Sequence, residues 1–442
     1  MKARLVPLYF ATPEDPDFVT QVQTLRTLLT DHAEILAPVQ LGSPLPDADA
    51  VVFPQLLGDA FRRLEQIKAI PLPILVVTSE FGTVSMWDWE IDNFLASKGV
   101  NVIAPYNLDL TQKICDTLAA KREMQHAKLL VYQDNPGAGF QANIFKRFYW
   151  WEDECVEQLE NKFGVKVLKK SFKTLGTVAR EIPDSEAENV WQDWKDRVPL
   201  GAMPTRSLLS AVKLYMAVKR DLDQDASIAA AGINCLNESH FSDTTPCLAW
   251  NLLYEDQRMV WGCEADLVSM ATKLLIQKTL KVPFMMTNLY PFLMGMAALK
   301  HEHIPYFPEV EAQPENHVLS AHCGFFGVVP QSFSTEWTLR KKVLAIVDEN
   351  ATAIDARLPE GDLTLIKLMP PFDSISVVEA QLTGYAQFEN SDCRNGAIIR
   401  VPNGPHLMQE LASHHYILTV GKNLAALENV SMVFGISCKV IQ

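Results

Sequence analysis

Three short apolar segments in the second half of the chain each end in a side chain that could bind a metal ion or move a proton. Glu264 and Asp266 follow the first segment, Asn288 follows the second and His322 follows the third. Apolar segments of this length predict buried strands. An open α/β sheet builds its site from polar side chains at the carboxyl ends of such strands. Each residue alone is more often an ordinary strand-to-loop residue, so it is their combination that indicates a site.

Histidines occur as two pairs far apart in the sequence, His317 with His322 and His414 with His415. Imidazole and carboxylate ligands suit Mn²⁺ or a similar divalent ion. A lone histidine is more often structural, so these pairs indicate a metal site only if the fold unites them. Adjacent side chains of an extended segment point to opposite faces, which predicts that only one of His414 and His415 reaches the site.

Two further groups are candidates for substrate binding. Trp87 and Trp89 lie in the loop after the third predicted strand, at the end of the sheet where ligands bind in such folds. They could stack on a sugar, although packing between subunits or domains is at least as common a use. Lys146 and Arg147 could bind an anionic group, and a solvated helix face is the default interpretation. The dinucleotide motif Gly-x-Gly-x-x-Gly is absent from the sequence.

Three regions differ in their secondary-structure pattern. Residues 1–122 alternate strand and helix patterns, which predicts a Rossmann-like, doubly wound parallel sheet. Residues 123–280 repeat the alternation, carry Glu264 and predict a second α/β domain of the same kind. Residues 281–442 are dominated by short β-like runs, which predict a mostly β C-terminal domain, sandwich or barrel, that carries His322 and His414.

Composition limits the classes of partner. The 442 residues are 48% hydrophobic and 21% charged, which is typical of a globular protein of two or three domains. A net charge of −14 argues against nucleic acid or an anionic membrane as the main partner. The eight cysteines show no C-x-x-C spacing and no apolar run reaches membrane-spanning length, so we expect a cytoplasmic protein.

The second half of the chain resembles the L-fucose isomerase and L-arabinose isomerase superfamily. Five short motifs occur in the order found in that superfamily, and the last is similar to the C-terminal histidine motif of the arabinose branch. They are Thr244-Thr-Pro-Cys-Leu-Ala, Gly262-Cys-Glu-Ala-Asp-Leu, Phe284-Met-Met-Thr-Asn-Leu, Ser320-Ala-His-Cys and Ser413-His-His-Tyr-Ile-Leu.

The resemblance implies an aldose–ketose isomerase that acts on a small sugar through a metal-stabilised enediolate. It implies a divalent metal, typically Mn²⁺, and a trimer or hexamer whose sites are shared between subunits. By position, Glu264 matches the first carboxylate ligand, and His322 and His414 match the two histidines of the arabinose branch. Asn288 stands where the fucose branch has an aspartate, or Thr287 stands where the arabinose branch has a glutamate. Asn288 would then share the metal-binding and catalytic role with Glu264 and His322, without a carboxylate.

Two alternatives remain open from the sequence. The lost carboxylate at 287–288 suits a degenerate sugar-binding or regulatory protein of the same fold. Lys146 and Arg147 suit an isomerase of an anionic sugar, such as a sulfosugar or a phosphosugar.

Overall fold

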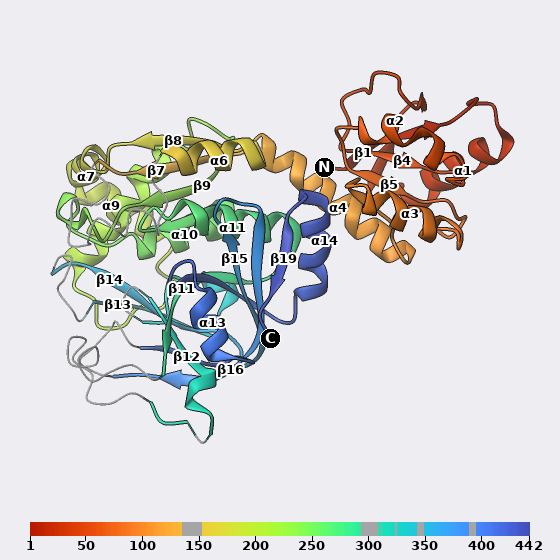
Figure 1. Ribbon diagram of the computed structural model, residues 1–442. Helices are drawn as coiled ribbons and strands as arrows, with labels where there is room; N and C mark the ends of the chain where they lie inside the picture. Colours follow the sequence, from red (N-terminus) through yellow and green to blue (C-terminus); the bar gives the residue numbers. More distant parts are fainter. Residues whose placement is uncertain (135–152, 293–307, 311, 323–324, 343–348, 389–394) are drawn as a thin grey trace. The chain divides into compact units, whose positions relative to one another are not determined.

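The computed structural model describes residues 1–134, 153–292, 308–310, 312–322, 325–342, 349–388 and 395–442. Two compact units are present (Figure 1). One consists of Met1–Gln125 and Ala425–Ser437, and the other of His126–Leu424 and Cys438–Gln442. The first unit ends close to the boundary expected at 122. The regions expected as separate second and third domains belong to the same compact unit.

The N-terminal unit is built on a parallel sheet with the strand order β2-β1-β4-β5-β6, and β3 pairs with the end of β1. Its strands are short apolar runs, and β4 is buried at every position. Asp15 caps the first helix, and Pro16 begins it. The elements are β1 (Ala3–Tyr9), α1 (Pro16–Leu28), β2 (Ala33–Ile35), β3 (Val39–Gln40), β4 (Ala50–Phe53), η1 (Ala60–Arg63), α2 (Leu64–Lys68), β5 (Ile74–Val76), α3 (Asp88–Ser97), β6 (Val102–Ile103), α4 (Leu108–Gln125) and, from the end of the chain, α14 (Leu424–Phe434).

Helix α3 carries two buried carboxyl groups one turn apart. Asp88 is 1% exposed and accepts hydrogen bonds from Leu57 N at 2.8 Å and from Thr78 Oγ1 at 2.7 Å. Asp92 is 6% exposed, and neither of its carboxyl oxygens has a hydrogen-bond partner among the described residues. Burial, and then the charge of Asp88, raise the pKa of Asp92 to about 7.

The second unit begins with a parallel sheet in the order β10-β9-β7-β8. The last helix of this part spans Leu267–Thr279. The elements are β7 (Lys128–Tyr132), α6 (Asp153–Phe163), β8 (Lys166–Lys170), α7 (Phe172–Glu181), α8 (Asp184–Gln192), α9 (Thr205–Leu222), β9 (Ile228–Ile233), η2 (Ser239–Phe241), α10 (Cys247–Gln257), β10 (Val260–Cys263) and α11 (Leu267–Thr279).

The remaining strands confirm the expectation of a mostly β C-terminal part and make it a barrel. Antiparallel pairing runs in the order β15-β18-β11-β12-β17-β16, and pairing of β15 with β16 closes the barrel. The elements are β11 (Phe284–Pro291), η3 (Pro314–Asn316), β12 (His317–Ala321), η4 (Gln331–Phe333), β13 (Glu336–Lys341), β14 (Thr352–Arg357), β15 (Gly361–Met369), β16 (Ser374–Ala386), β17 (Gly396–Arg400), α13 (Gly404–Glu410), β18 (His415–Val420) and β19 (Ser437–Val440).

Helix α11 lies between the parallel sheet and the barrel (Figure 1). Every residue from Leu267 to Ile276 is buried, because one face packs on β9 and β10 and another on β11, β15 and β18. Two glycines make room for it. A Cβ on Gly232 would lie 2.7 Å from Met270 Sδ, and one on Gly262 would lie closer still. The helix therefore fixes the end of β10 against the strands of the barrel.

In the described part of the chain, none of the helices combines the length and apolar character that crossing a membrane requires.

Candidate metal centre

Glu264 lies at a strained turn directly after β10. Its φ is +56° and that of Ala265 is +52°, and Asp266 N closes the turn by donating to Cys263 O at 3.2 Å. Side chains with a Cβ rarely occupy this left-handed region, and two in succession are usually asparagine or glycine. Backbone strain of this kind clusters at functional sites. The turn leaves the Glu264 side chain 5% exposed.

Asp266 links this turn to the barrel. Its carboxylate caps α11 by accepting from Ser269 N at 2.9 Å and from Ser269 Oγ at 2.7 Å. It also lies 2.8 Å from His415 Nδ1, and both side chains are fully buried. Burial alone would raise the pKa of Asp266. The nearby Lys367 ammonium and the hydrogen bonds from His415 and Ser269 instead hold this pKa well below its usual range. An ionised Asp266 makes Nδ1 of His415 the protonated nitrogen and directs Nε2 to be the ligand.

Glu264, His322 and His415 converge. Each offers a ligand atom, and these atoms all lie within 4.8 Å of one another. Glu264 Oε1 lies 3.7 Å from His322 Nε2, and the centroids of the two imidazole rings are 5.4 Å apart. Two imidazoles and a carboxylate, with a second carboxylate behind one imidazole, form a donor set typical of divalent transition metals. A buried group of this composition could hold a metal ion.

His322 fits the role of a neutral ligand. It is 3% exposed, and its Nε2 makes no hydrogen bond to any residue that the structure describes. Burial lowers the pKa of His322 well below its usual value. The ring is therefore unprotonated at neutral pH, and its buried lone pair can coordinate a cation.

His415, and not His414, belongs to this group. The alignment of the C-terminal motif favoured His414, but β18 begins only at His415. His414 lies in the bend before the strand, half-buried, and its carbonyl accepts a hydrogen bond from Leu289 N at 2.9 Å. Its ring is 4.5 Å from that of His415, so it borders the group without being one of the three converging side chains.

Asn288 and Thr287 lie on β11 beside the group, and neither supplies a carboxylate. Asn288 pairs in register with His415 on β18, so both side chains leave the sheet on the same face. Its Nδ2 donates to Tyr290 Oη at 2.7 Å, and its buried Oδ1 has no hydrogen-bond partner among the described residues. Thr287 is fully buried, and its hydroxyl accepts from Ser320 Oγ at 2.7 Å. An amide oxygen at Asn288 remains available as a neutral ligand.

Of the four candidate substrate residues, only the two tryptophans lie among the described residues, and neither is one of the three converging side chains. Trp87 and Trp89 belong to the N-terminal unit, at the start of α3, and are 66% and 37% exposed. Lys146 and Arg147 lie outside the described residues.

Two buried lysines lie near the group, and neither was a candidate from the sequence. Lys273 on α11 donates to Trp261 O, and its ammonium lies 4.3 Å from the centroid of the Trp261 ring. Burial lowers the pKa of Lys273 to about 8. Lys367 on β15 is 1% exposed and lies close enough to Asp266 to stabilise its charge. A lysine inside an otherwise apolar helix or strand was the only signal for either residue.

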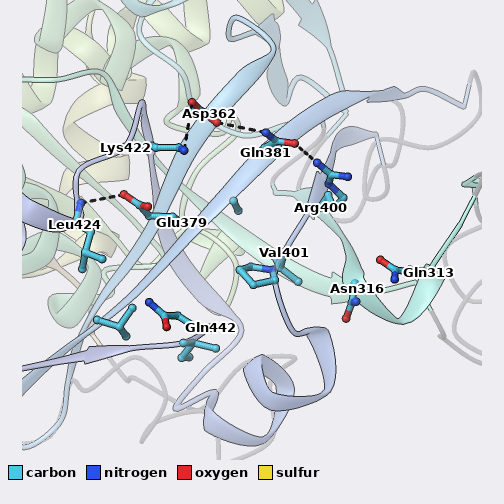
Figure 2. A pocket seen from close by; sticks show the side chains of 14 residues that line it. Gln313, Asn316, Asp362, Glu379, Gln381, Arg400, Val401, Lys422, Leu424 and Gln442 are labelled. Carbon is cyan, nitrogen blue, oxygen red and sulfur yellow. Dashed lines mark hydrogen bonds and ion pairs between the residues drawn. The ribbon is translucent and has the colours of Figure 1, made fainter.

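A hollow of about 460 Å³ lies beside strands β15, β16 and β17 (Figure 2). Four of its charged and polar side chains contact one another. Asp362 lies 4.0 Å from Lys422 Nζ and accepts from Gln381 Nε2 at 3.4 Å, and Arg400 donates to Gln381 (Figure 2). Because these four side chains pair with one another, we do not take this hollow as the functional site.

Comparison of the chain with models of known protein families gives no match, and comparison with curated protein sequences gives none either.

Substituting the two neighbouring histidines separates their roles. We expect His415→Ala to weaken divalent-metal binding by at least about 10- to 100-fold, the range for losing a residue that supports a metal site. His414→Ala should stay close to the wild-type affinity. Calorimetric titration of metal-stripped protein with Mn²⁺ measures both. Equal losses in the two variants would contradict the assignment of His415.

Proposed function

We propose that the protein is a metal-dependent aldose–ketose isomerase of the fucose and arabinose isomerase type, acting on a small sugar. Its two parallel sheets would then be the Rossmann-like, doubly wound domains of that superfamily. The observation that carries the proposal is the buried group of Glu264, His322 and His415, whose ligand atoms lie within 4.8 Å of one another. Glu264 of this group follows the carboxyl end of β10, where α/β sheets bind their ligands.

The chemistry divides between these residues. A divalent ion, Mn²⁺ being the expectation, would polarise the substrate carbonyl and stabilise the negative charge of the enediolate. Glu264 removes the proton from C2, beside the carbonyl, and returns it to C1 on the same face, while the proton of the C2 hydroxyl group passes to the C1 oxygen. His322 and His415 hold the ion, and Asp266 keeps His415 in the tautomer with Nε2 as the ligand.

An exchange experiment tests this function. A panel of aldoses is incubated with the Mn²⁺-loaded protein in deuterated water and followed by NMR. We expect one aldose to be converted to its ketose, with deuterium incorporated at C1 of the ketose and, through the reverse reaction, at C2 of the aldose, because the proton carried by a carboxylate exchanges with solvent. Absence of conversion and of exchange for the whole panel, with the metal shown to be bound, would overturn the proposal. Phosphorylated and sulfonated sugars in the panel test the anionic-sugar alternative.

A sugar-binding protein that has lost catalysis is the second candidate. It is favoured by Thr287 and Asn288, which leave Glu264 as the only carboxylate among the three converging side chains. A site with one carboxylate binds a divalent ion less tightly than a site with two. Sugar binding by a protein that retains no divalent ion, even when Mn²⁺ is added, would favour this candidate over the isomerase.

We also propose that the protein is a homo-oligomer of at least three subunits. Large apolar side chains are exposed after the carboxyl ends of the adjacent strands β4, β5 and β6, which place them along one edge of the sheet. They are Leu56, Phe61, Phe81, Met86, Trp87 and Tyr106, each more than half exposed. Monomeric proteins rarely expose large apolar patches of this kind.

Light scattering at micromolar concentration measures the assembly. We expect a trimer or larger species for the wild type, and smaller species for the double variant Phe81→Ser/Trp87→Ser. Leu200→Ser is the control, because Leu200 is 41% exposed, belongs to the second unit and does not follow β4, β5 or β6. A wild-type monomer that retains full activity would contradict the prediction.

A further inference from the structure

Polar side chains follow three adjacent parallel strands at the same edge of the second sheet. Tyr132 on β7 pairs with Ile233 on β9, and Ile233 pairs with Cys263 on β10. The next residue of each strand is Gln133, Asn234 and Glu264. Neighbouring strands are about 4.8 Å apart, so the two amides continue the row that starts at Glu264 of the metal centre.

These amides are buried and incompletely bonded. Asn234 and Asn237 are fully buried and Gln133 is 8% exposed. Asn237 Nδ2 donates to Asn234 Oδ1 at 3.2 Å. Asn234 Nδ2, Asn237 Oδ1 and Gln133 Oε1 then have no hydrogen-bond partner in the part of the chain that the structure describes. If the amide oxygen and nitrogen are exchanged in both asparagines, the pair still leaves one NH₂ group and one carbonyl oxygen without a partner among the described residues.

Buried polar groups without partners are destabilising, and proteins keep them where a ligand supplies the missing bonds. A hydroxyl group both donates and accepts, so it can satisfy the amide NH₂ of one asparagine and the carbonyl of the other. We propose that Asn234, Asn237 and Gln133 form a subsite that binds the hydroxyl groups of the non-reacting carbons of a polyhydroxylated substrate. This inference rests on the proposed function, because it takes Glu264 as the reacting end.

The charge of the surroundings points to a neutral substrate. Next to Asn237 lies Glu238, which is 2% exposed and accepts from Asp134 N at 3.1 and 3.0 Å through its two oxygens. The subsite therefore consists of neutral amides with a carboxylate beside them. A phosphate or sulfonate at this position would be repelled, whereas a sugar hydroxyl would not.

Alditols test the subsite because they carry the hydroxyl groups of an open-chain sugar and cannot be isomerised. Ribitol, xylitol, arabinitol and galactitol are titrated one by one into the Mn²⁺-loaded protein by calorimetry. We expect at least one to bind at millimolar concentration or below. Asn234→Ala/Asn237→Ala should weaken that binding about 10- to 100-fold, the effect of losing two neutral hydrogen bonds. Its melting temperature should stay the same or rise, since the deleted atoms include two that have no partner within the described residues.

Asn251→Ala is the matched control. Asn251 is equally buried, and its Nδ2 also has no hydrogen-bond partner among the described residues, but its Oδ1 accepts a backbone hydrogen bond from Gln331 N at 2.8 Å. This variant should melt at a lower temperature and bind the alditol as the wild type does.

Three results would overturn the subsite. They are unchanged alditol affinity in the folded double variant, an equal loss of affinity in Asn251→Ala, and no binding of any of the four alditols to the wild type. If the double variant does not fold, Asn234→Ser and Asn237→Ser are measured singly, and unchanged affinity in both overturns it equally. Failure of the isomerase proposal is distinguishable, because it appears as absent deuterium incorporation while alditol binding still depends on the two asparagines.

Discussion

Glu264→Gln is expected to lower the turnover of the isomerisation by about 100-fold or more, the contribution of a positioned general base. Glutamine has nearly the same shape and keeps one carbonyl oxygen, so it can remain in the strained turn after β10 and at 5% exposure. It cannot accept the proton from the substrate carbon. It also removes the single negative charge among the three converging side chains, so we expect weaker metal binding in the same variant.

The two effects are measured separately. Turnover is measured at saturating Mn²⁺ with the aldose that the exchange experiment identifies, and the affinity for Mn²⁺ is measured by calorimetry. Glu255→Gln is the matched control. Its Oε1 accepts a hydrogen bond from Ser332 N at 2.8 Å, and a glutamine can keep this bond. Its activity should equal that of the wild type. Wild-type turnover in Glu264→Gln at full metal occupancy would remove Glu264 from the proton transfer.

Asp92→Asn is expected to stabilise the N-terminal unit at pH 8 by about 2–4 kcal/mol and to leave its stability at pH 4 nearly unchanged. The pKa of Asp92 is raised to about 7 in the folded protein, whereas the unfolded chain has the ordinary value of 3.8. The folded state therefore holds this proton more tightly. The free energy of unfolding therefore falls as the pH rises from 4 to 7, because the folded state must then bury an ionised Asp92 next to Asp88. Asparagine carries no charge at any of these pH values.

Urea unfolding between pH 4 and 8, followed by hydrogen–deuterium exchange in peptides of the N-terminal unit, measures this dependence. Glu90→Gln provides the control, because it removes the same charge from the same helix at an exposed position. It should leave the pH profile of the wild type unchanged. An equally steep loss of stability in Asp92→Asn between pH 4 and 7 would show that another group causes it.

The amino-acid sequence by itself determined the character of the three regions. Alternating apolar and amphipathic segments predicted the two parallel α/β parts. The short β-like runs after residue 281 predicted the mostly β part, which is a barrel. These predictions succeed because strand and helix periodicities are local properties, written in consecutive residues. The same logic placed Glu264 directly after a strand.

Only the tertiary structure decided which side chains meet. His415 joins Glu264 and His322 because β18 begins at His415 and packs beside the start of α11, where Asp266, 149 residues away in the sequence, accepts its hydrogen bond. The left-handed turn at Glu264 and Ala265 contradicts the local preference of both residues. Contacts of this kind depend on the closure of the barrel and its packing against α11.

The partners of the buried lysines and amides were likewise decided only by the tertiary structure. Lys273, Lys367 and the pair of Asn234 and Asn237 lie within or directly after apolar segments, where the sequence alone predicts only a core position or a turn. Their roles depend on which partner the fold places beside them, an aromatic ring and a carbonyl for Lys273, a carboxylate for Lys367 and another amide for Asn234. Periodicity specifies which face of an element is buried, whereas the identity of the neighbour is a property of the packed fold.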